Sequence, residues 1–238
     1  MSKQNIIIFG ASGAIGQALC QSFLVKNYAV TAVSRTGIVP DNNLTEAVWL
    51  SWDAFDNDGV IPIFNDSLMF NAVVWAQGAN CNDDIHTFDL KVHEKLYSAN
   101  VTYILVALQC LLRQSLLAPS ARLCIISSIW QNLARNNKLS YCTTKSALQG
   151  LVQSLMVDLG RTGYLLNAVL PGALDTPMTR ANLSEEQIRL LKNLTPLGNL
   201  PDLNDVCQLV GFLCSEENKG ITGQFIAADR GFSYARII

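Results

Sequence analysis

Histidine and charged residues are scarce in this chain of 238 residues: there are two histidines, and Asp, Glu, Lys and Arg make up 15%. The two histidines and seven cysteines, none of them in a Cys-x-x-Cys pair, offer little from which to build a zinc site, so no metal is expected. A net charge of −2, with 17 scattered basic residues, gives no general attraction to nucleic acid or to anionic membranes. We expect neither as a partner.

Long apolar runs are missing too. None approaches the roughly 20 residues needed to span a bilayer, and the N-terminal sequence MSKQNIIIFGASG has no signal-type apolar stretch with a cleavage site. Most of the cysteines sit in apolar stretches and their number is odd, which favours buried thiols in a reducing compartment over a disulfide framework. The expected location is the cytoplasm.

What the sequence does contain is an alternation of two patterns, in a composition that is 50% apolar. Short β-branched runs are typical of buried parallel strands, and amphipathic stretches of helical length lie between them. The expected strands are Asn5–Phe9, Ala29–Ser34, Ala47–Trp52, Asn71–Ala76, Arg122–Ser127, Tyr164–Leu170 and Gln224–Ala228. The expected helices include Ile15–Lys26, Val92–Ser115, Tyr141–Arg161 and Asn204–Cys214.

Strands that alternate with helices form a parallel sheet covered on both faces. We therefore expect a Rossmann-type, doubly wound α/β fold, with a mostly parallel sheet of seven strands and helices on both faces. No repeat, low-complexity tract or Pro/Gly/Ser linker divides the chain, so residues 1–238 are expected to form one dinucleotide-binding domain.

A glycine-rich turn follows the first expected strand and opens the first helix. Glycine lets the chain turn tightly and lets the backbone approach a pyrophosphate, whose charge is favoured at a helix N-terminus. A plain strand-to-helix turn is the alternative, but the position at the start of a βαβ unit favours a dinucleotide site. The residues expected to bind the cofactor here are Gly10, Ser12, Gly13, Ala14, Ile15 and Gly16.

The choice between NAD and NADP is made about 20 residues further on, at the end of the second strand. No Asp or Glu occurs between Gly10 and Asp41, and Ser34 and Arg35 stand where an acidic residue would bind both ribose hydroxyls. The Arg35 guanidinium is a planar donor fork that suits a 2′-phosphate, although a solvated surface arginine would give the same pattern. We expect NADPH rather than NADH. Asp53, just past the third strand, is either an acceptor for the adenine amine or an exposed turn residue.

Tyr141 is the one tyrosine of six with a lysine four residues later. On a helix this spacing places Tyr141 and Lys145 on one face, where the ammonium group stabilises a phenolate. An unperturbed phenol has a pKa of ~10, so a neighbouring cation makes it a usable acid or base at neutral pH. A helix-surface pair would show the same spacing. Two more polar positions support the chemistry, because Ser128 ends an apolar strand at the ligand-binding edge and Asn100 interrupts a long helical stretch.

These motifs together resemble the short-chain dehydrogenase/reductase family, essentially from end to end. The resemblance implies that Tyr141 is the proton donor, that Ser128 hydrogen-bonds the substrate carbonyl, and that Lys145 binds the nicotinamide ribose and lowers the tyrosine pKa. Asn100 would hold a water that continues the proton relay. The further cofactor contacts implied by the resemblance are Ala76, Gln77, Gly78, Tyr141, Lys145, Pro171, Gly172, Leu174 and Thr176.

The chain departs from the family's usual pattern at four places. Phe9 stands where a threonine is common, Ala14 where a glycine is usual, and Ala76 where an asparagine precedes Gln77-Gly78. Near the C-terminus, Asp229-Arg230-Gly231 stands where a second glycine is frequent.

The expected substrate is a small-molecule or carrier-bound carbonyl compound. The segment from Asp175 to Gln187 resembles bacterial 3-oxoacyl-(acyl carrier protein) reductases, in which the arginine after Met-Thr helps to receive the acidic carrier. By this resemblance Met178 and Arg180 contact substrate, within a lid over residues 175–200; the generic lid of a sugar or alcohol enzyme is the alternative. In the loop after Ser128, three residues are expected to face substrate as an aromatic wall and polar donors: Trp130, Gln131 and Arg135.

The functional hypothesis is an NADPH-dependent reductase of a ketone or a 3-oxoacyl thioester, acting through Asn100, Ser128, Tyr141 and Lys145. An alcohol or sugar dehydrogenase that works in the oxidative direction is one alternative. A non-catalytic dinucleotide-sensing regulator is another, but a regulator needs the glycine turn and not the tyrosine. An isomerase or dehydratase of the extended relatives would need a larger substrate region than this chain has after Pro171.

Two helical stretches, Val101–Leu117 and Leu148–Leu159, carry apolar residues beyond a single face. A helix that is apolar nearly all round is usually buried, and one face of a sheet does not cover it. A symmetric interface would cover the rest, so we expect a homodimer or homotetramer. The alternative is that these helices lie deep in the core of the monomer.

Overall fold

A parallel sheet of seven strands, in the order β3-β2-β1-β4-β5-β6-β7, forms the centre of the computed structural model. The structure describes residues 3–36, 44–56, 59–63, 67–176, 179–180 and 183–235. The strands are β1 (Asn5–Phe9), β2 (Ala29–Ser34), β3 (Val48–Ser51), β4 (Phe70–Trp75), β5 (Leu117–Ile126), β6 (Leu165–Pro171) and β7 (Phe225–Ala228). The expected Rossmann-type α/β fold is confirmed.

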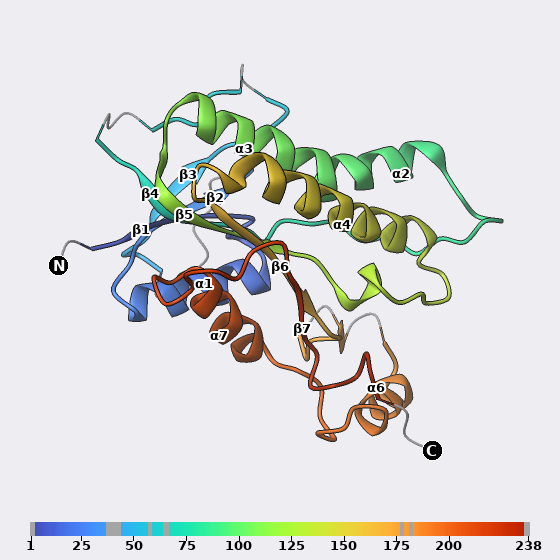
Figure 1. Cartoon of the computed structure of the whole chain (residues 1–238). Helices are drawn as coiled ribbons and strands as arrows, with labels where there is room; N and C mark the ends of the chain where they lie inside the picture. The colour runs from blue at the N-terminus through green and yellow to red at the C-terminus, as the bar shows by residue number, and fades with distance from the viewer. Residues whose placement is uncertain are drawn as a thin grey trace.

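Helices cover both faces of the sheet (Figure 1). One layer holds α2 (Leu90–Tyr97), α3 (Tyr103–Arg113) and α4 (Leu139–Gly160). The other layer holds α1 (Ala14–Val25) and α7 (Leu203–Leu213), and α6 (Glu185–Asn193) stands apart from both layers (Figure 1). Because of this double cover, the consecutive isoleucines Ile6, Ile7 and Ile8 of β1 are all fully buried.

The observed strand borders lie within one residue of the expected ones, with one exception. β5 begins at Leu117 rather than at the expected Arg122, and Leu117 pairs with Phe70 before a shift in register. The sequence between these points contains Pro119 and Ser120, which are typical of a turn, and Ser120 has a φ of +58°. The irregular start of β5 was therefore missed because Pro119 and Ser120 indicate a turn at this point of the sequence.

The single helix expected over Val92–Ser115 is wrong in one respect. It is α2 and α3 joined by a π-helical turn, Ser98–Thr102, and Asn100 lies in that turn. Such turns are frequent at functional sites. By length and composition Leu90–Arg113 is the one described stretch apolar enough to cross a membrane, but half of it is buried inside the protein, as in a core helix.

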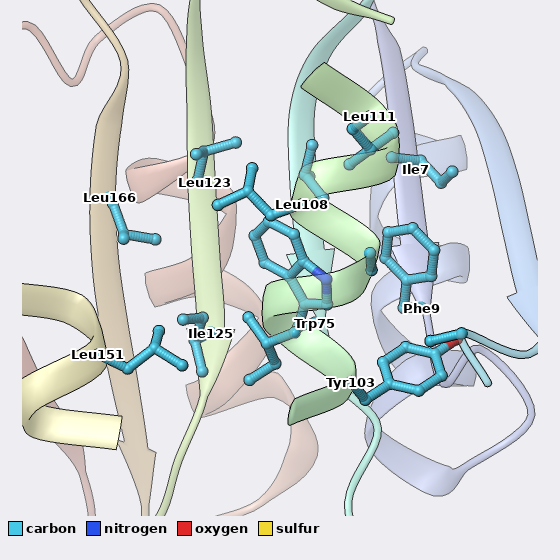
Figure 2. Close-up of a cluster of buried hydrophobic side chains, with 14 of the residues drawn as sticks. Ile7, Phe9, Trp75, Tyr103, Leu108, Leu111, Leu123, Ile125, Leu151 and Leu166 are labelled. Carbon is cyan, nitrogen blue, oxygen red and sulfur yellow. The ribbon is translucent and has the colours of Figure 1, made fainter. Parts of the chain in front are cut away.

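The core on the α3/α4 side of the sheet is rich in aromatic and branched side chains (Figure 2). Phe9, the last residue of β1, stacks on Trp75, the last residue of β4, with 6.0 Å between ring centroids and 8° between planes. Tyr103 approaches Phe9 edge-on at 6.1 Å. An aromatic stack therefore braces the strand ends that carry two of the family departures, Phe9 and the adjacent Ala76.

α6 was not among the expected helices. It begins with a capping box, in which the Ser184 hydroxyl accepts from the Gln187 N–H and the Gln187 side chain accepts from the Ser184 N–H. The sequence Ser-x-x-Gln is the signature of such a cap, so this helix was predictable. The cysteines follow expectation: all seven are free, and five are buried, namely Cys20, Cys110, Cys124, Cys207 and Cys214.

Candidate active site

The glycine-rich turn lies where the carboxyl ends of β1, β2 and β4 meet. Gly10 has a φ of +74°, and a Cβ built on it would lie 2.4 Å from the backbone nitrogen of Gln77. A Cβ on Gly16 would lie 2.2 Å from the carbonyl oxygen of Gly10. The Ala11 N–H donates to the Val33 carbonyl at 3.0 Å and fixes the turn beside β2. The backbone packing therefore requires glycine at positions 10 and 16.

Polar groups without a hydrogen-bond partner in the described chain lie beside this turn. In the described part of the chain, the buried Ser34 hydroxyl and the buried carboxamide of Gln77 have no hydrogen-bond partner. α1 begins at Ala14, directly after its N-cap Gly13, and the first N–H groups of a helix have no partner within it. Unpartnered polar groups beside a helix N-terminus fit the phosphates and ribose of a dinucleotide.

The other residues expected at the cofactor lie around the same edge. Ser12 and Arg35 are exposed, and Ile15 is half-buried in the first turn of α1. The Asp53 carboxylate accepts from the Phe55 N–H at 3.1 Å, which is a turn contact. Arg35 is near enough to the buried phenol of Tyr103 to oppose, by its charge, the rise in the pKa of that phenol that burial causes.

Tyr141 and Lys145 lie in the first two turns of α4. The Lys145 Nζ is 5.8 Å from the centroid of the Tyr141 ring, and it donates to the carbonyl oxygen of Ile126 at 3.1 Å. The Ser128 hydroxyl forms a hydrogen bond with the Tyr141 phenol, and it also accepts from the Trp130 N–H at 3.3 Å. The structure thus brings the predicted serine, tyrosine and lysine together.

Burial shifts the pKa values of Lys145 and Tyr141. Desolvation lowers the pKa of Lys145 to about 8. Desolvation also raises the pKa of Tyr141 above its ordinary value, and the hydrogen bond with Ser128 opposes this rise. At neutral pH Tyr141 is therefore protonated, which is the form that a proton donor needs, and Lys145 is mainly an ammonium.

Asn100 is buried and holds the site together from the π-helical turn. Its Oδ1 accepts from the Ala79 N–H at 2.7 Å, and its Nδ2 donates to the Ala79 carbonyl at 3.1 Å. The same Nδ2 donates to the Thr144 hydroxyl at 2.9 Å, which donates to the Tyr141 carbonyl. Both amide hydrogens are thus used within the protein, so a water expected at Asn100 would not receive a bond from them. A Cβ on Gly78 would lie 3.2 Å from the Asn100 Oδ1, so Gly78 leaves room for this arrangement.

The segment after β6 lies at the same edge of the sheet. The Gly172 N–H donates to the Ala228 carbonyl at 3.1 Å directly after Pro171, and a Cβ on Gly172 would lie 3.0 Å from the Cβ of Asp229. Two buried residues follow, Leu174 and Thr176. The Thr176 hydroxyl, which the resemblance assigns to the nicotinamide amide, lies 3.2 Å from the Thr179 hydroxyl.

The residues expected to face the substrate after Ser128 lie in different surroundings. Trp130 packs edge-on against Phe232, with ring centroids 6.5 Å apart, and both line a small apolar cavity. Gln131 is 5% exposed, and its Oε1 accepts from the Ser127 hydroxyl at 2.8 Å, so this side chain braces the loop from inside. Arg135 is exposed and lines an open cavity of about 930 Å³.

That cavity lies against a face of α4 that differs from the face of Tyr141. The α4 residues that line it are Leu139, Cys142, Thr143 and Ser146, and the described lining includes neither Ser128 nor Tyr141. In the segment predicted to form a lid, the Arg180 guanidinium forms a two-bond ion pair with Asp175 at 2.8 Å and remains 63% exposed. Met178 lies outside the described residues.

A polar cluster beside Tyr141 was missed by the sequence analysis. The Ser140 N–H donates to Asp83 Oδ1 at 3.0 Å, and its hydroxyl donates to Asp83 Oδ2. The His93 Nδ1 lies 2.9 Å from the same hydroxyl. Although desolvation raises the pKa of Asp83, these Ser140 bonds hold it below its ordinary value. The partners are far apart along the chain and form no motif, so no local signal marked them.

Known oxidoreductases resemble this chain along most of its length. The family model described as "Enoyl-(Acyl carrier protein) reductase" matches residues 66–233. The 3-oxoacyl-[acyl-carrier-protein] reductase FabG of Aquifex aeolicus is 36% identical over 229 residues, which are 95% of this chain and 86% of that protein. L-xylulose reductase of Bos taurus is 27% identical over 245 residues, which are 98% of this chain and 97% of that protein.

A solved structure shows the same fold. The ligand-free aldohexose dehydrogenase of Thermoplasma acidophilum superposes with a TM-score of 0.87 and 22% identity, over 99% of this chain and 96% of that one. The family model covers more than half of the chain, and the relative from Aquifex aeolicus is similar along nearly all of it. The chain therefore belongs to the short-chain dehydrogenase/reductase family of oxidoreductases that act on CH–OH groups.

Proposed function

We propose that this protein is an NADPH-dependent carbonyl reductase. The observation that carries the proposal is the position of the Tyr141 phenol, which forms a hydrogen bond with Ser128 and has the Lys145 Nζ 5.8 Å from its ring centroid. This group sits at the sheet edge that also carries the glycine-rich turn. Reduction needs a proton donor beside a dinucleotide site, and this edge supplies both.

A nicotinamide dinucleotide held at the glycine-rich turn and at Ser34 and Arg35 would supply a hydride to the carbonyl carbon. The Ser128 hydroxyl orients the carbonyl oxygen, and the Tyr141 Oη–H gives its proton to that oxygen as negative charge develops. The Lys145 ammonium then stabilises the phenolate that remains. Asn100 keeps α4 in register with Ala79 through its three hydrogen bonds, so that the tyrosine stays aimed at the substrate.

The preference for NADPH rests on the end of β2. The Ser34 hydroxyl is buried without a partner in the described chain, and Arg35 beside it is exposed. A hydroxyl and a guanidinium together bind a 2′-phosphate, whereas the carboxylate that would select NADH is missing there.

For the substrate, a 3-oxoacyl thioester or a small keto compound fits the proposal. The relative from Aquifex aeolicus is named for a 3-oxoacyl carrier-protein substrate, and the bovine relative for a sugar ketone. Arg180, proposed to receive the acidic carrier, is held by Asp175 and still 63% exposed, so part of its guanidinium remains free to meet an anion.

The test is a panel of carbonyl compounds, including acyl thioesters and keto-sugars, followed by loss of NADPH absorbance. We expect turnover of at least one compound, faster with NADPH than with NADH. A protein that binds the dinucleotide but turns over none of them would instead be a dinucleotide-sensing regulator. Turnover confined to alcohols with NADP⁺ would show a dehydrogenase that works in the oxidative direction.

Arg35→Ala tests the cofactor preference in the same assay. Loss of a charged hydrogen bond to phosphate is expected to weaken NADPH by about ten-fold or more. NADH, which has no 2′-phosphate, should bind almost as before. Lys3→Ala, which removes an exposed cation at the start of the chain, is the control and should change neither affinity. Equal affinities for both cofactors in the unmodified protein would contradict the assignment.

We also propose that the protein assembles into a homodimer or homotetramer. Some apolar residues of the expected helices are buried within the monomer, among them Leu108, Leu111 and Leu116. Others remain exposed on the α2/α3/α4 layer: Leu90, Val92, Tyr97, Leu105, Leu112, Leu139 and Val157. Light scattering should give two or four times the chain mass of 26.0 kDa. A fully active monomer would contradict this.

A further inference from the structure

Lys138 is a buried lysine that the proposed mechanism does not use. It is the N-cap residue of α4, three positions before Tyr141, and it is 8% exposed. Its Nζ lies 5.7 Å from the centroid of the Tyr141 ring, almost the same distance as the Nζ of Lys145. The catalytic phenol therefore has two ammonium groups near its ring.

The hydrogen bonds of Lys138 show that it is charged. Its Nζ donates to Asn80 Oδ1 at 2.8 Å, to the Cys81 carbonyl at 3.0 Å and to Asn82 Oδ1 at 2.5 Å. A neutral amine has two hydrogens and an ammonium has three, so three acceptors require the ammonium form. All three acceptors are neutral, so the positive charge is solvated by dipoles without being cancelled by a bonded carboxylate.

The same loop is fastened to α4 at several further points. The Asp83 N–H donates to the Asn137 carbonyl at 3.3 Å, and the Leu139 N–H donates to the Asp83 carbonyl at 3.1 Å. With the Asp83–Ser140 bonds, these contacts hold Asp83 at the start of the helix independently of Lys138. Lys138 has no hydrogen left for substrate, so its effect on the reaction passes through Tyr141.

We propose that Lys138 is a positioning residue for the reaction, a second buried ammonium group that stabilises the Tyr141 phenolate together with Lys145. The inference rests on the proposed function, in which Tyr141 exchanges a proton with the substrate oxygen. The other titratable or hydrogen-bonding groups near Tyr141 and Lys138 are Cys81, Asp83, Ser128, Arg135, Cys142 and Lys145. Of the lysines in the described chain, Lys138 and Lys145 have their ammonium groups within 6 Å of the centroid of the Tyr141 ring, at 5.7 and 5.8 Å.

The test is the pH dependence of kcat/KM in the oxidative direction, measured on the holoenzyme with an alcohol and saturating NADP⁺. Oxidation needs the phenolate, so kcat/KM rises as Tyr141 loses its proton. In Lys138→Gln, which keeps amide donors for the loop but lacks the charge, the rise should move to higher pH by about one unit. Lys138→Arg, which keeps the charge, should restore the rise to near its original pH.

Two controls separate charge from loop anchoring. Asn82→Ala removes one oxygen that accepts from Lys138 and leaves the charge of Lys138 in place. It should therefore change kcat/KM without moving the pH at which kcat/KM rises. Lys91→Met removes an exposed cation on α2 and should leave the pH dependence of kcat/KM unchanged. If Lys138→Gln slows oxidation equally at every pH, Lys138 only anchors the loop and the proposal is overturned. If Lys138→Gln does not fold by circular dichroism, Lys138→Met takes its place.

A measurement without substrate distinguishes failure of this inference from failure of the proposed function. Phenolate formation at Tyr141 is followed by ultraviolet difference absorbance, with the Tyr141→Phe protein subtracted to remove the other five of the six tyrosines. Lys138→Gln should shift this titration to higher pH, even if no substrate is found. An unchanged titration refutes the inference and leaves the proposed reductase activity untouched.

Discussion

Replacing Tyr141 with phenylalanine is expected to lower turnover by about 10²–10⁴-fold while NADPH still binds. Hydride addition leaves negative charge on the carbonyl oxygen, and in the proposed mechanism the proton of Tyr141, which is hydrogen-bonded to Ser128, neutralises it. The ring itself is kept by the substitution, so its contacts with the Nζ atoms of Lys138 and Lys145 are preserved. Steady-state turnover and NADPH fluorescence titration, made on the same preparation, measure the two effects separately.

Tyr164→Phe is the matched control, since it removes a phenolic hydroxyl at a different position. Tyr164 directly precedes β6 and is far in the sequence from the first turn of α4. It should keep near-normal turnover. A Tyr141→Phe protein that reduces its substrate at a near-normal rate would remove the proposed mechanism. Loss of both turnover and NADPH binding would indicate that the ring position, and not the proton, had been disturbed.

Gly10→Ala is expected to unfold the protein or to abolish dinucleotide binding. The new Cβ would lie 2.4 Å from the Gln77 backbone nitrogen and 2.8 Å from the Ala76 carbonyl carbon, and neither backbone atom can move without breaking β1–β4 pairing. The φ of +74° adds a further penalty of about 1 kcal/mol for any residue with a Cβ. Thermal unfolding and NADPH titration measure the result.

The control for this clash is the same substitution at the end of α4. A Cβ on Gly160 meets nothing within 4 Å, and its φ is not in the left-handed region. Gly160→Ala should therefore leave the melting temperature the same or raise it slightly, since glycine in a helix costs about 0.5–1 kcal/mol relative to alanine. A Gly10→Ala protein as stable as Gly160→Ala would show that the turn can open at no cost.

The features that the sequence predicted well are those with a short-range signal. The buried strands were visible as β-branched runs, and the Tyr141–Lys145 pair as a spacing of four on a helix. Gly10 and Gly16 were visible because the glycine-rich turn that contains Gly10 directly follows a strand, and Gly16 lies in the helix that the turn opens. Each of these depends on residues that are neighbours in sequence, so the pattern and the structure carry the same information.

The features that the sequence did not predict depend on contacts between segments that are far apart in the sequence. Lys138 meets Asn80 and Asn82 only because the loop after β4 folds onto the start of α4, and no spacing along the chain marks that contact. Gln131 is likewise held by α4, because its carbonyl accepts from the Ser146 hydroxyl at 2.9 Å. The π-helical turn places Asn100 against Ala79, and Ala79 lies in a separate loop.

The strand order has a consequence for how the chain is made. β1 pairs with β2 on one side and with β4 on the other, through contacts such as Ile6 with Ala72. While the chain leaves the ribosome, β1 and β2 emerge long before Phe70, so one edge of β1 has unpaired N–H and C=O groups during that interval. Such an edge is a template for pairing with another chain. The exposure ends when residues 72–75 of β4 pair with β1, so the risk of aggregation during synthesis is highest before these residues emerge.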